Sequence, residues 1–217
     1  MDSDLSTGTQ AGNHFNRLIE AAADLISGGN LTCFPTMAVI AERAGLTEAR
    51  AVELFSNSEN LLNTVAQQGM IRLNDISTRM TARVPAGDLI GQVEALSLSY
   101  LIWSVENPGL FVLVSQRNIS EFLRQGDVER YDEGIRLLLT RLLVRAREQG
   151  LLPPQTDINR KLLALRSMLY GLARMHLDRH LLNWMPQDAD ITQMLTDTVR
   201  DFVRHDTFRD ADTTRPG

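Results

Sequence analysis

The chain has 217 residues, of which 43% are hydrophobic and 23% charged, a balance typical of a globular protein with one or two domains. This composition excludes an intrinsically disordered or collagen-like chain. The single cysteine, Cys33, excludes an internal disulfide, and the longest uncharged apolar run, 95–105, falls well short of the roughly 20 residues of a membrane helix. The acidic start of the chain is not typical of a signal peptide. We therefore expect a cytoplasmic protein with no membrane partner.

The net charge of −5 is unevenly distributed along the chain. Residues 1–70 carry three arginines against eight acidic residues, whereas the remainder carries equal numbers of each sign. An acidic N-terminal segment is a poor electrostatic match to nucleic acid, which usually attracts basic surfaces.

In chain order, apolar residues recur at helical spacing almost everywhere after residue 12, and no segment alternates as a strand would. Glycines and prolines mark the breaks, as at Gly28-Gly29 and Pro153-Pro154. We expect helices over 15–26, 36–44, 48–54, 59–80, 88–105, 110–114, 129–148, 157–183 and 191–202. The polar ends, 1–12 and 207–217, are expected to be disordered. The predicted fold class is all-α.

The second and third predicted helices are joined by the short turn Ala44-Gly45-Leu46-Thr47. Gly45 allows a left-handed turn, Leu46 can pack where the helices cross, and Thr47 can cap the next helix. This pattern is typical of a helix-turn-helix, whose second helix can lie in the DNA major groove. The next helix is predicted to open with a capping box, Ser56-Asn57-Ser58-Glu59.

Three segments, Leu18–Ala22, Thr36–Thr47 and Phe55–Leu62, have the order and spacing by which this chain resembles the TetR family of bacterial transcriptional regulators. Further on, Tyr100–Phe111 and Tyr170–Ala173 are similar to segments common in the regulatory domain of that family. The resemblance implies an N-terminal three-helix DNA-binding domain and a larger C-terminal helical domain that binds a ligand and dimerises.

The implied domain boundaries are 13–57 for the helix-turn-helix domain and 58–206 for the ligand-binding and dimerisation domain. The chain departs from the family pattern at three positions of the DNA-binding head. Val52 stands where the family usually has an aromatic residue, Ser58 where it usually has lysine, and Ala49 where glycine is common.

Arg50, the only cation of the predicted recognition helix, is the best candidate for a base contact, because arginine can bond guanine O6 and N7 together. Glu48 or Glu53 could accept from cytosine N4, but each adds repulsion near phosphates. Hydroxyl and amide side chains near the helix ends could donate to phosphates, and few such contacts predict weak or salt-sensitive binding. The predicted DNA-binding residues are Thr36, Arg43, Thr47, Glu48, Ala49, Arg50, Glu53, Asn57 and Ser58.

Large apolar and aromatic residues on the long helices could line a ligand cavity or simply fill the core, and periodicity cannot separate the two roles. The resemblance places the ligand cavity among these helices, so we expect a hydrophobic or amphipathic small molecule. The candidate ligand-binding residues are Met70, Trp103, Phe111, Arg117, Met168, Tyr170, Arg174, Met175 and His176.

Two apolar stripes suggest a homodimer held by a four-helix bundle. One stripe comprises Leu162, Leu165, Leu169 and Leu172, and the other Leu195, Val199, Phe202 and Val203. The alternative is that both stripes fill the core of one subunit.

The histidines, the cysteine and the acidic pairs considered as metal ligands or catalytic residues have simpler structural explanations. His176 and His180 lie four residues apart on a predicted helix, but no further ligand is placed to complete a metal site. Cys33 has no cysteine partner, and the acidic pairs Asp127/Glu129 and Asp132/Glu133 beside Tyr131 suit a helix start. We expect no cofactor, no metal and no enzymatic activity.

The leading hypothesis is a homodimeric regulator that binds double-stranded operator DNA, a repressor released by a hydrophobic small molecule. The alternative, motivated by the acidic head and by Val52 and Ser58, is a binding module of the same fold. Such a module would have lost operator binding and would act through a small ligand or a protein partner.

Overall fold

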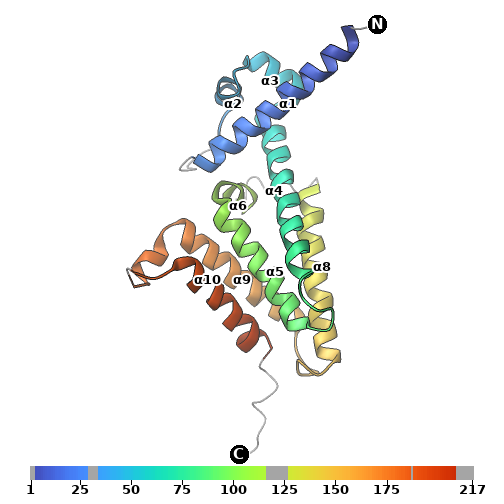
Figure 1. The fold of residues 1–217 in the computed structure, drawn as a ribbon, viewed down its shortest axis with the longest axis vertical. Helices are drawn as coiled ribbons and strands as arrows, with labels where there is room; N and C mark the ends of the chain where they lie inside the picture. Colours follow the sequence, from blue (N-terminus) through green and yellow to red (C-terminus); the bar gives the residue numbers. More distant parts are fainter. Residues whose placement is uncertain (1–2, 29–33, 116–126, 187, 209–217) are drawn as a thin grey trace, which may run out of the picture. The chain divides into compact units, whose positions relative to one another are not determined.

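A computed structural model describes residues 3–28, 34–115, 127–186 and 188–208 (Figure 1). Every regular element in these ranges is a helix, which confirms the predicted all-α fold. None of the helices described is long and apolar enough to cross a membrane. The helices are α1 (Ser3–Gly28), α2 (Met37–Arg43), α3 (Glu48–Phe55), α4 (Ser58–Thr81), α5 (Leu89–Glu106), α6 (Pro108–Ser115), α8 (Asp127–Glu148), α9 (Ile158–Leu177), the 3-10 helix η1 (His180–Asn183), α10 (Ile191–Asp201) and the π-helix η2 (Phe202–Thr207).

The chain divides into two compact units. The first unit comprises Met1–Ile71 and Asn107–Glu129, and the second comprises Arg72–Glu106 and Arg130–Gly217. The boundary between residues 57 and 58 separates the predicted DNA-binding domain from the predicted ligand-binding and dimerisation domain. This functional division stays a prediction.

In the first unit, α1 packs against α2 and α6 through one apolar face. Leu18, Ala22 and Ile26 of α1 are fully buried, as the helical spacing predicts. The approach of α6 to α1 depends on Gly109, because a Cβ there would lie 2.2 Å from the carbonyl oxygen of Ile26. A larger residue would force the two helices apart.

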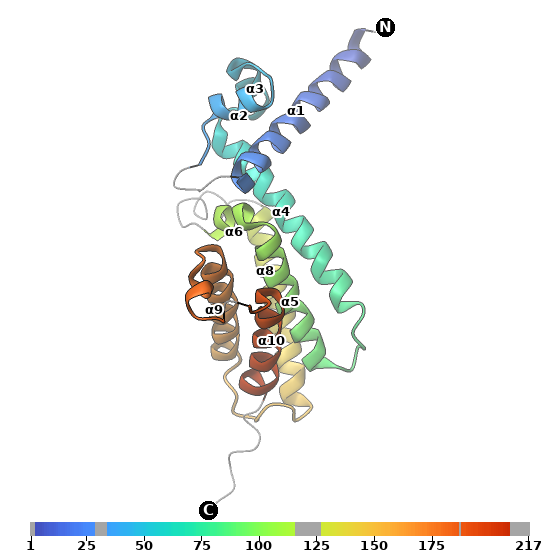
Figure 2. The ribbon, with the colours of Figure 1, turned by 60° about the vertical axis from the view of Figure 1, so that its left-hand side comes forward.

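In the second unit, α5 is apolar over most of its circumference, and α9 and α10 lie along it (Figures 1 and 2). A helix that is hydrophobic all round must be covered on several sides. The cover includes Leu142 and Leu143 of α8, which belong to the same core cluster as the buried residues of α5, α9 and α10.

The two stripes that the sequence suggested as a dimer seam belong to this core instead. Leu165 and Leu169 of α9 are at most 4% exposed, and Leu195, Val199 and Val203 at most 2%. Leu162, Leu172 and Phe202 are partly buried against the same cluster. The assignment of these stripes to a subunit interface is therefore wrong, because α5 within the same subunit covers them.

Several helix ends differ from the expected ones. α1 begins at Ser3, so residues 3–12 lie within the helix rather than outside it. Ser56 does not start α4 through a capping box, because it ends α3 with a positive φ of 64°, and Asn57 caps α4 instead.

The C-terminal part of the chain also differs from the expected one. α9 ends at Leu177, since Arg179 is left-handed with φ 57° and interrupts the helix expected to reach Asn183. Thr207 and Phe208, expected in the disordered end, are buried instead, because η2 extends to Thr207 and Phe208 joins the core cluster of the second unit. Residues 209–217, Cys33 and Arg117 lie outside the described residues.

Candidate functional site

α2 and α3 form the helix-turn-helix that the sequence predicts. The turn between them contains Gly45 in a left-handed conformation, with φ 65°, which glycine adopts at little cost. The amide of Leu46 donates to the carbonyl of Ala41 across the end of α2, and Arg17 of α1 donates to the carbonyl of Ala44. The turn is therefore held by backbone bonds from within and by one side chain from α1.

The buried side of this motif fixes the orientation of α3. Met37, Ile40 and Ala41 of α2 and Ala51 and Phe55 of α3 are buried. The ring of Phe55 stacks on that of Phe15 in α1, with ring centroids 4.5 Å apart. This packing turns the opposite face of α3 outward.

Two threonines cap the short helices. Thr36 Oγ1 accepts from the amide of Val39 at 3.5 Å, and Thr47 Oγ1 accepts from the amide of Arg50 at 3.2 Å. In both cases the hydroxyl proton stays available to donate to a phosphate. Asn57 Oδ1 likewise accepts from the amide of Asn60 at 2.8 Å, which leaves its NH₂ group as a donor.

The nine predicted DNA-binding residues lie on the surface of the first unit. Arg50 and Ser58 are partly exposed, and the other seven are exposed. The structure thus presents these side chains at α2, at α3 and at the start of α4, and their contacts with DNA stay a prediction.

Both cations of this surface are paired with acidic side chains. Arg50 Nη1 lies 2.6 Å from Glu53 Oε2, and Arg43 Nη2 lies 3.8 Å from Asp24 Oδ2. Sequence reasoning missed both pairs, although the spacing of Arg50 and Glu53 is a known signal for a helical ion pair. A phosphate would have to compete with these carboxylates for the two guanidinium groups.

The exposed surface of α2 and α3 also contains two apolar side chains. Val52 of α3 and Val39 of α2 are 43% and 44% exposed. A valine cannot donate a hydrogen bond, so the position where the family usually carries an aromatic residue offers only van der Waals contact here.

The candidate ligand-binding residues are divided between the two units. Met70 and Phe111 are buried in the first unit, and Trp103 is buried in the second. Met168, Met175 and His176 are partly exposed on α9, Tyr170 is exposed, and Arg174 pairs with Asp178 at 2.9 Å. Their role in binding stays a prediction.

Tyr100 of α5 lies at the centre of a polar and aromatic cluster in the second unit. The guanidinium of Arg166 lies 4.8 Å from the centre of its ring and 3.5 Å from Asp132 Oδ1. Burial raises the pKa of the Tyr100 phenol above its ordinary value, and the charge of Arg166 partly offsets this effect. Trp103, one helical turn further along, lies 6.3 Å from Tyr100 between ring centroids. The pairing of Asp132 with Arg166 gives this acidic residue a role that the sequence did not suggest.

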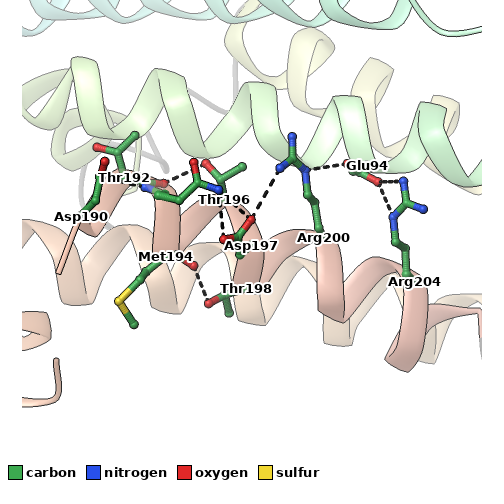
Figure 3. A network of polar contacts seen from close by, with 10 residues as sticks. Glu94, Asp190, Thr192, Met194, Thr196, Asp197, Thr198, Arg200 and Arg204 are labelled. Atoms are coloured by element: carbon green, nitrogen blue, oxygen red, sulfur yellow. Dashed lines mark hydrogen bonds and ion pairs between the residues drawn. The ribbon is translucent and has the colours of Figure 1, made fainter. Parts of the chain in front are cut away.

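A second group that sequence reasoning missed is the carboxylate of Glu94 on α5, which is almost buried (Figure 3). Arg200 Nε donates to Oε1 at 3.0 Å, and Arg204 Nη2 lies 2.7 Å from Oε2. Figure 3 shows both arginines reaching from the last helical segments towards the same carboxylate. The signal in the sequence was a lone acid within an apolar helix, which requires a partner when it is buried.

The two histidines considered as metal ligands do not share a helix face. α9 ends at Leu177, and His180 follows the left-handed Arg179 in a separate 3-10 turn. Nowhere in the described ranges do three histidine, cysteine or acidic side chains come together as a metal site would require.

Comparison with known proteins agrees with this arrangement. A family model described as "Tetracyclin repressor-like, C-terminal domain" matches residues 93–207, more than half of the chain. No curated protein matches the sequence.

Several solved structures share the fold at low sequence identity. The fatty acid degradation regulator FadR from Bacillus halodurans is 20% identical, with TM-score 0.66, and the match covers 87% of this chain and 93% of that one. FadR from Bacillus subtilis, solved in complex with stearoyl-CoA, is 14% identical, with TM-score 0.68 and coverage of 88% and 98%. The ketosteroid regulator KstR2 of Mycobacterium tuberculosis is 16% identical, with TM-score 0.61 and coverage of 88% and 92%.

These neighbours establish the fold, and the match to the family model establishes the family. Together with the helix-turn-helix of α2 and α3, they confirm the resemblance that the sequence suggested. The chain belongs to the TetR family of bacterial transcriptional regulators.

Proposed function

We propose that this protein is a homodimeric regulator that binds operator DNA through α3 and is released from DNA by a hydrophobic or amphipathic small molecule. The observation that carries the proposal is the outward face of α3. The buried Ala51 and Phe55 fix the orientation of this helix, and Thr47 caps its start. A rigid short helix with an exposed polar face is the element that enters a major groove.

Contacts to phosphate would come mainly from neutral donors. The hydroxyls of Thr36 and Thr47, the amide of Asn57 and the free N–H groups at the helix starts are available for this role. Arg50 would release Glu53 and form hydrogen bonds with a guanine base. Few cationic contacts per subunit release few counterions, so we expect modest affinity with a shallow salt dependence, in place of the salt-sensitive binding considered from the sequence.

Dimerisation would use the outer surface of α9 and α10, because their inner stripes are already buried. Leu163 is 68% exposed and Tyr170 38% on α9, Met194 of α10 is 36% exposed, and Trp184 between them is 81% exposed. Large exposed apolar and aromatic residues are typical of a subunit interface.

The ligand would bind in the second unit near the Tyr100 and Trp103 cluster, where aromatic rings and a guanidinium lie together. An acyl-CoA thioester is the first candidate to test, because a protein of similar fold was solved with stearoyl-CoA. Ligand and DNA must then weaken the binding of each other by the same factor.

The direct test is fluorescence-anisotropy binding of the full-length chain to the DNA upstream of its own gene at two salt concentrations. We expect specific binding that Arg50→Ala weakens by about tenfold or more, the value of one lost bidentate base contact. Arg141→Ala, which removes an exposed arginine of α8, is the matched control and should bind like the wild type. Equal binding of the two variants would contradict the role of α3.

The second candidate is a binding module without operator affinity. It is favoured by the pairing of Arg50 and Arg43 with acidic side chains, which leaves the head with little free positive charge. No specific binding at low salt by an intact dimer, on this DNA or on other genomic fragments, would support this second candidate.

A further inference from the structure

Two apolar side chains lie next to each other on the exposed surface of α3. Val52 is 43% exposed, and Ala49 is exposed as well. Ala49 stands three residues before Val52, so the two side chains are neighbours on the helix surface. Val52 is not among the nine residues predicted to contact DNA, and the proposed function gives it no role.

Val52 lies at the edge of the outward face of α3. Ala51, the residue before it, and Phe55, three residues after it, are buried. The side chain of Val52 therefore lies between the buried side of the helix and the exposed pair of Arg50 and Glu53. When a recognition helix lies in a major groove, such an edge faces the bases along one side of the groove.

The charges around Val52 disfavour a phosphate as its partner. Glu48 stands four residues earlier, one turn away on the same side of α3, and Glu53 is the next residue. Both carboxylates are exposed and would repel the DNA backbone. Valine also has no hydrogen-bond donor for a phosphate oxygen. The edges of the bases, which carry no net charge, are the better partner for this side of the helix.

Thymine is the base that presents an apolar group in the major groove. Its 5-methyl group lies there, whereas guanine, adenine and cytosine present hydrogen-bond acceptors and donors. A valine placed against those three bases would cover polar groups without giving them a partner, which costs free energy. A valine placed against thymine removes apolar surface from water on both sides. The small side chain of Ala49 lets α3 approach such a base closely.

From these observations we propose that Val52 is a specificity-determining residue, which selects a thymine in each half of the operator by contacting its 5-methyl group. The proposal rests on the proposed binding of operator DNA through α3, and it adds the base that this edge of the helix reads. Arg50 reads guanine at a different base pair, because residues two positions apart on a helix do not face each other.

The test is fluorescence-anisotropy binding of the full-length chain to the DNA upstream of its own gene, with one thymine at a time replaced by uracil. Uracil pairs with adenine as thymine does and lacks only the methyl group. We expect one position in each half of the operator where the replacement weakens binding by about fourfold, the value of one buried methyl group. The contact involves no charge, so this factor should be the same at two salt concentrations.

Val52→Ala removes the side chain that would contact the methyl group. This variant should bind the thymine and the uracil duplexes with equal affinity at that position. Val39→Ala on α2 is the matched control, because it shortens a valine of nearly equal exposure, 44%, and it should keep the fourfold difference. Both positions are exposed, so both variants should fold like the wild type.

The outcomes distinguish this proposal from the proposed function. Specific binding that no single replacement of thymine weakens would overturn the proposal and leave operator binding intact. The same conclusion would follow if Val52→Ala kept the difference between thymine and uracil, or if Val39→Ala lost it too. No specific binding of the unmodified DNA or of other genomic fragments would overturn both.

Discussion

At the scale of single residues, the ion pair between Arg50 and Glu53 limits how well α3 can bind the bases and phosphates of DNA. The carboxylate occupies the guanidinium and also brings a negative charge to the surface that would face phosphates. Both effects oppose binding, and both act through charges that water and salt partly screen.

Glu53→Gln should therefore increase the affinity for DNA. The gain should reach up to about fivefold at low salt, in line with the value of an exposed ion pair, and should shrink as salt is added. Anisotropy titrations at two salt concentrations measure it, with Glu148→Gln on α8 as a control of equal charge change. If Glu53→Gln bound more weakly than the wild type, Glu53 would itself be a base-reading residue.

Gly45 is the residue on which the turn depends, since it has a positive φ and a Cβ would lie 2.9 Å from Arg17 Nη2. Gly45→Ala should lower the free energy of unfolding by about 1 kcal/mol or more, because both the backbone and the Arg17 contact are strained. Chemical denaturation measures the loss. Gly134→Ala in α8, where a Cβ meets open space, is the control and should not destabilise the protein. Equal stability of the two variants would show that the turn tolerates a side chain.

Local features at this scale were predictable from the sequence. The cap at Thr47 and the glycine turn depend only on neighbouring residues, and the structure has both. Thr36, expected inside the second helix, is its N-cap instead. The predicted capping box at Ser56 was wrong because the end of α3 and the start of α4 compete for the same residues. The pattern alone does not say which helix prevails.

At the scale of helices, Glu94 joins α5 to α10 and η2 through Arg200 and Arg204 (Figure 3). The carboxylate is 12% exposed, whereas the two arginines are about half exposed and can be solvated when it is removed. The pairing therefore matters more to the position of the last helices than to the core.

Glu94→Ala should lower the free energy of unfolding by about 1–2 kcal/mol, the range for hydrogen bonds that involve charged groups. Urea denaturation followed by circular dichroism measures this loss. Glu148→Ala, which removes an exposed acid at the end of α8, should change stability little. A loss no larger for Glu94→Ala than for this control would mean that the three side chains contribute nothing to helix packing.

The helices themselves were largely predictable, but their partners were not. Periodicity placed the apolar stripes of α9 and α10 correctly on one face of each helix, yet it could not say what covers that face. Glu94 and its arginines are separated by 106 and 110 residues, so no local pattern could have paired them.

At the scale of the whole molecule, the proposed dimer depends on residues that the subunit leaves uncovered. Leu163→Glu places a charge at a side chain that is 68% exposed, so the fold of the monomer should be unaffected while the interface is lost. Analytical ultracentrifugation should show the mass of a monomer for this variant. Ile71→Glu on α4, at a side chain 43% exposed, is the control and should remain dimeric. A dimer that persists with Leu163→Glu would place the interface on another surface.

The proposed regulator function requires that the α2–α3 head recognise a particular DNA sequence. The most direct measurement is to sequence the genomic fragments of the source organism that the purified full-length chain retains at low salt. We expect enrichment of a two-fold symmetric sequence with half-sites about one helical turn apart, and loss of this enrichment in Arg50→Ala. Retention no different from the input DNA, by a chain that is intact and dimeric, would contradict the claim and favour a module that acts through its ligand or protein partner alone.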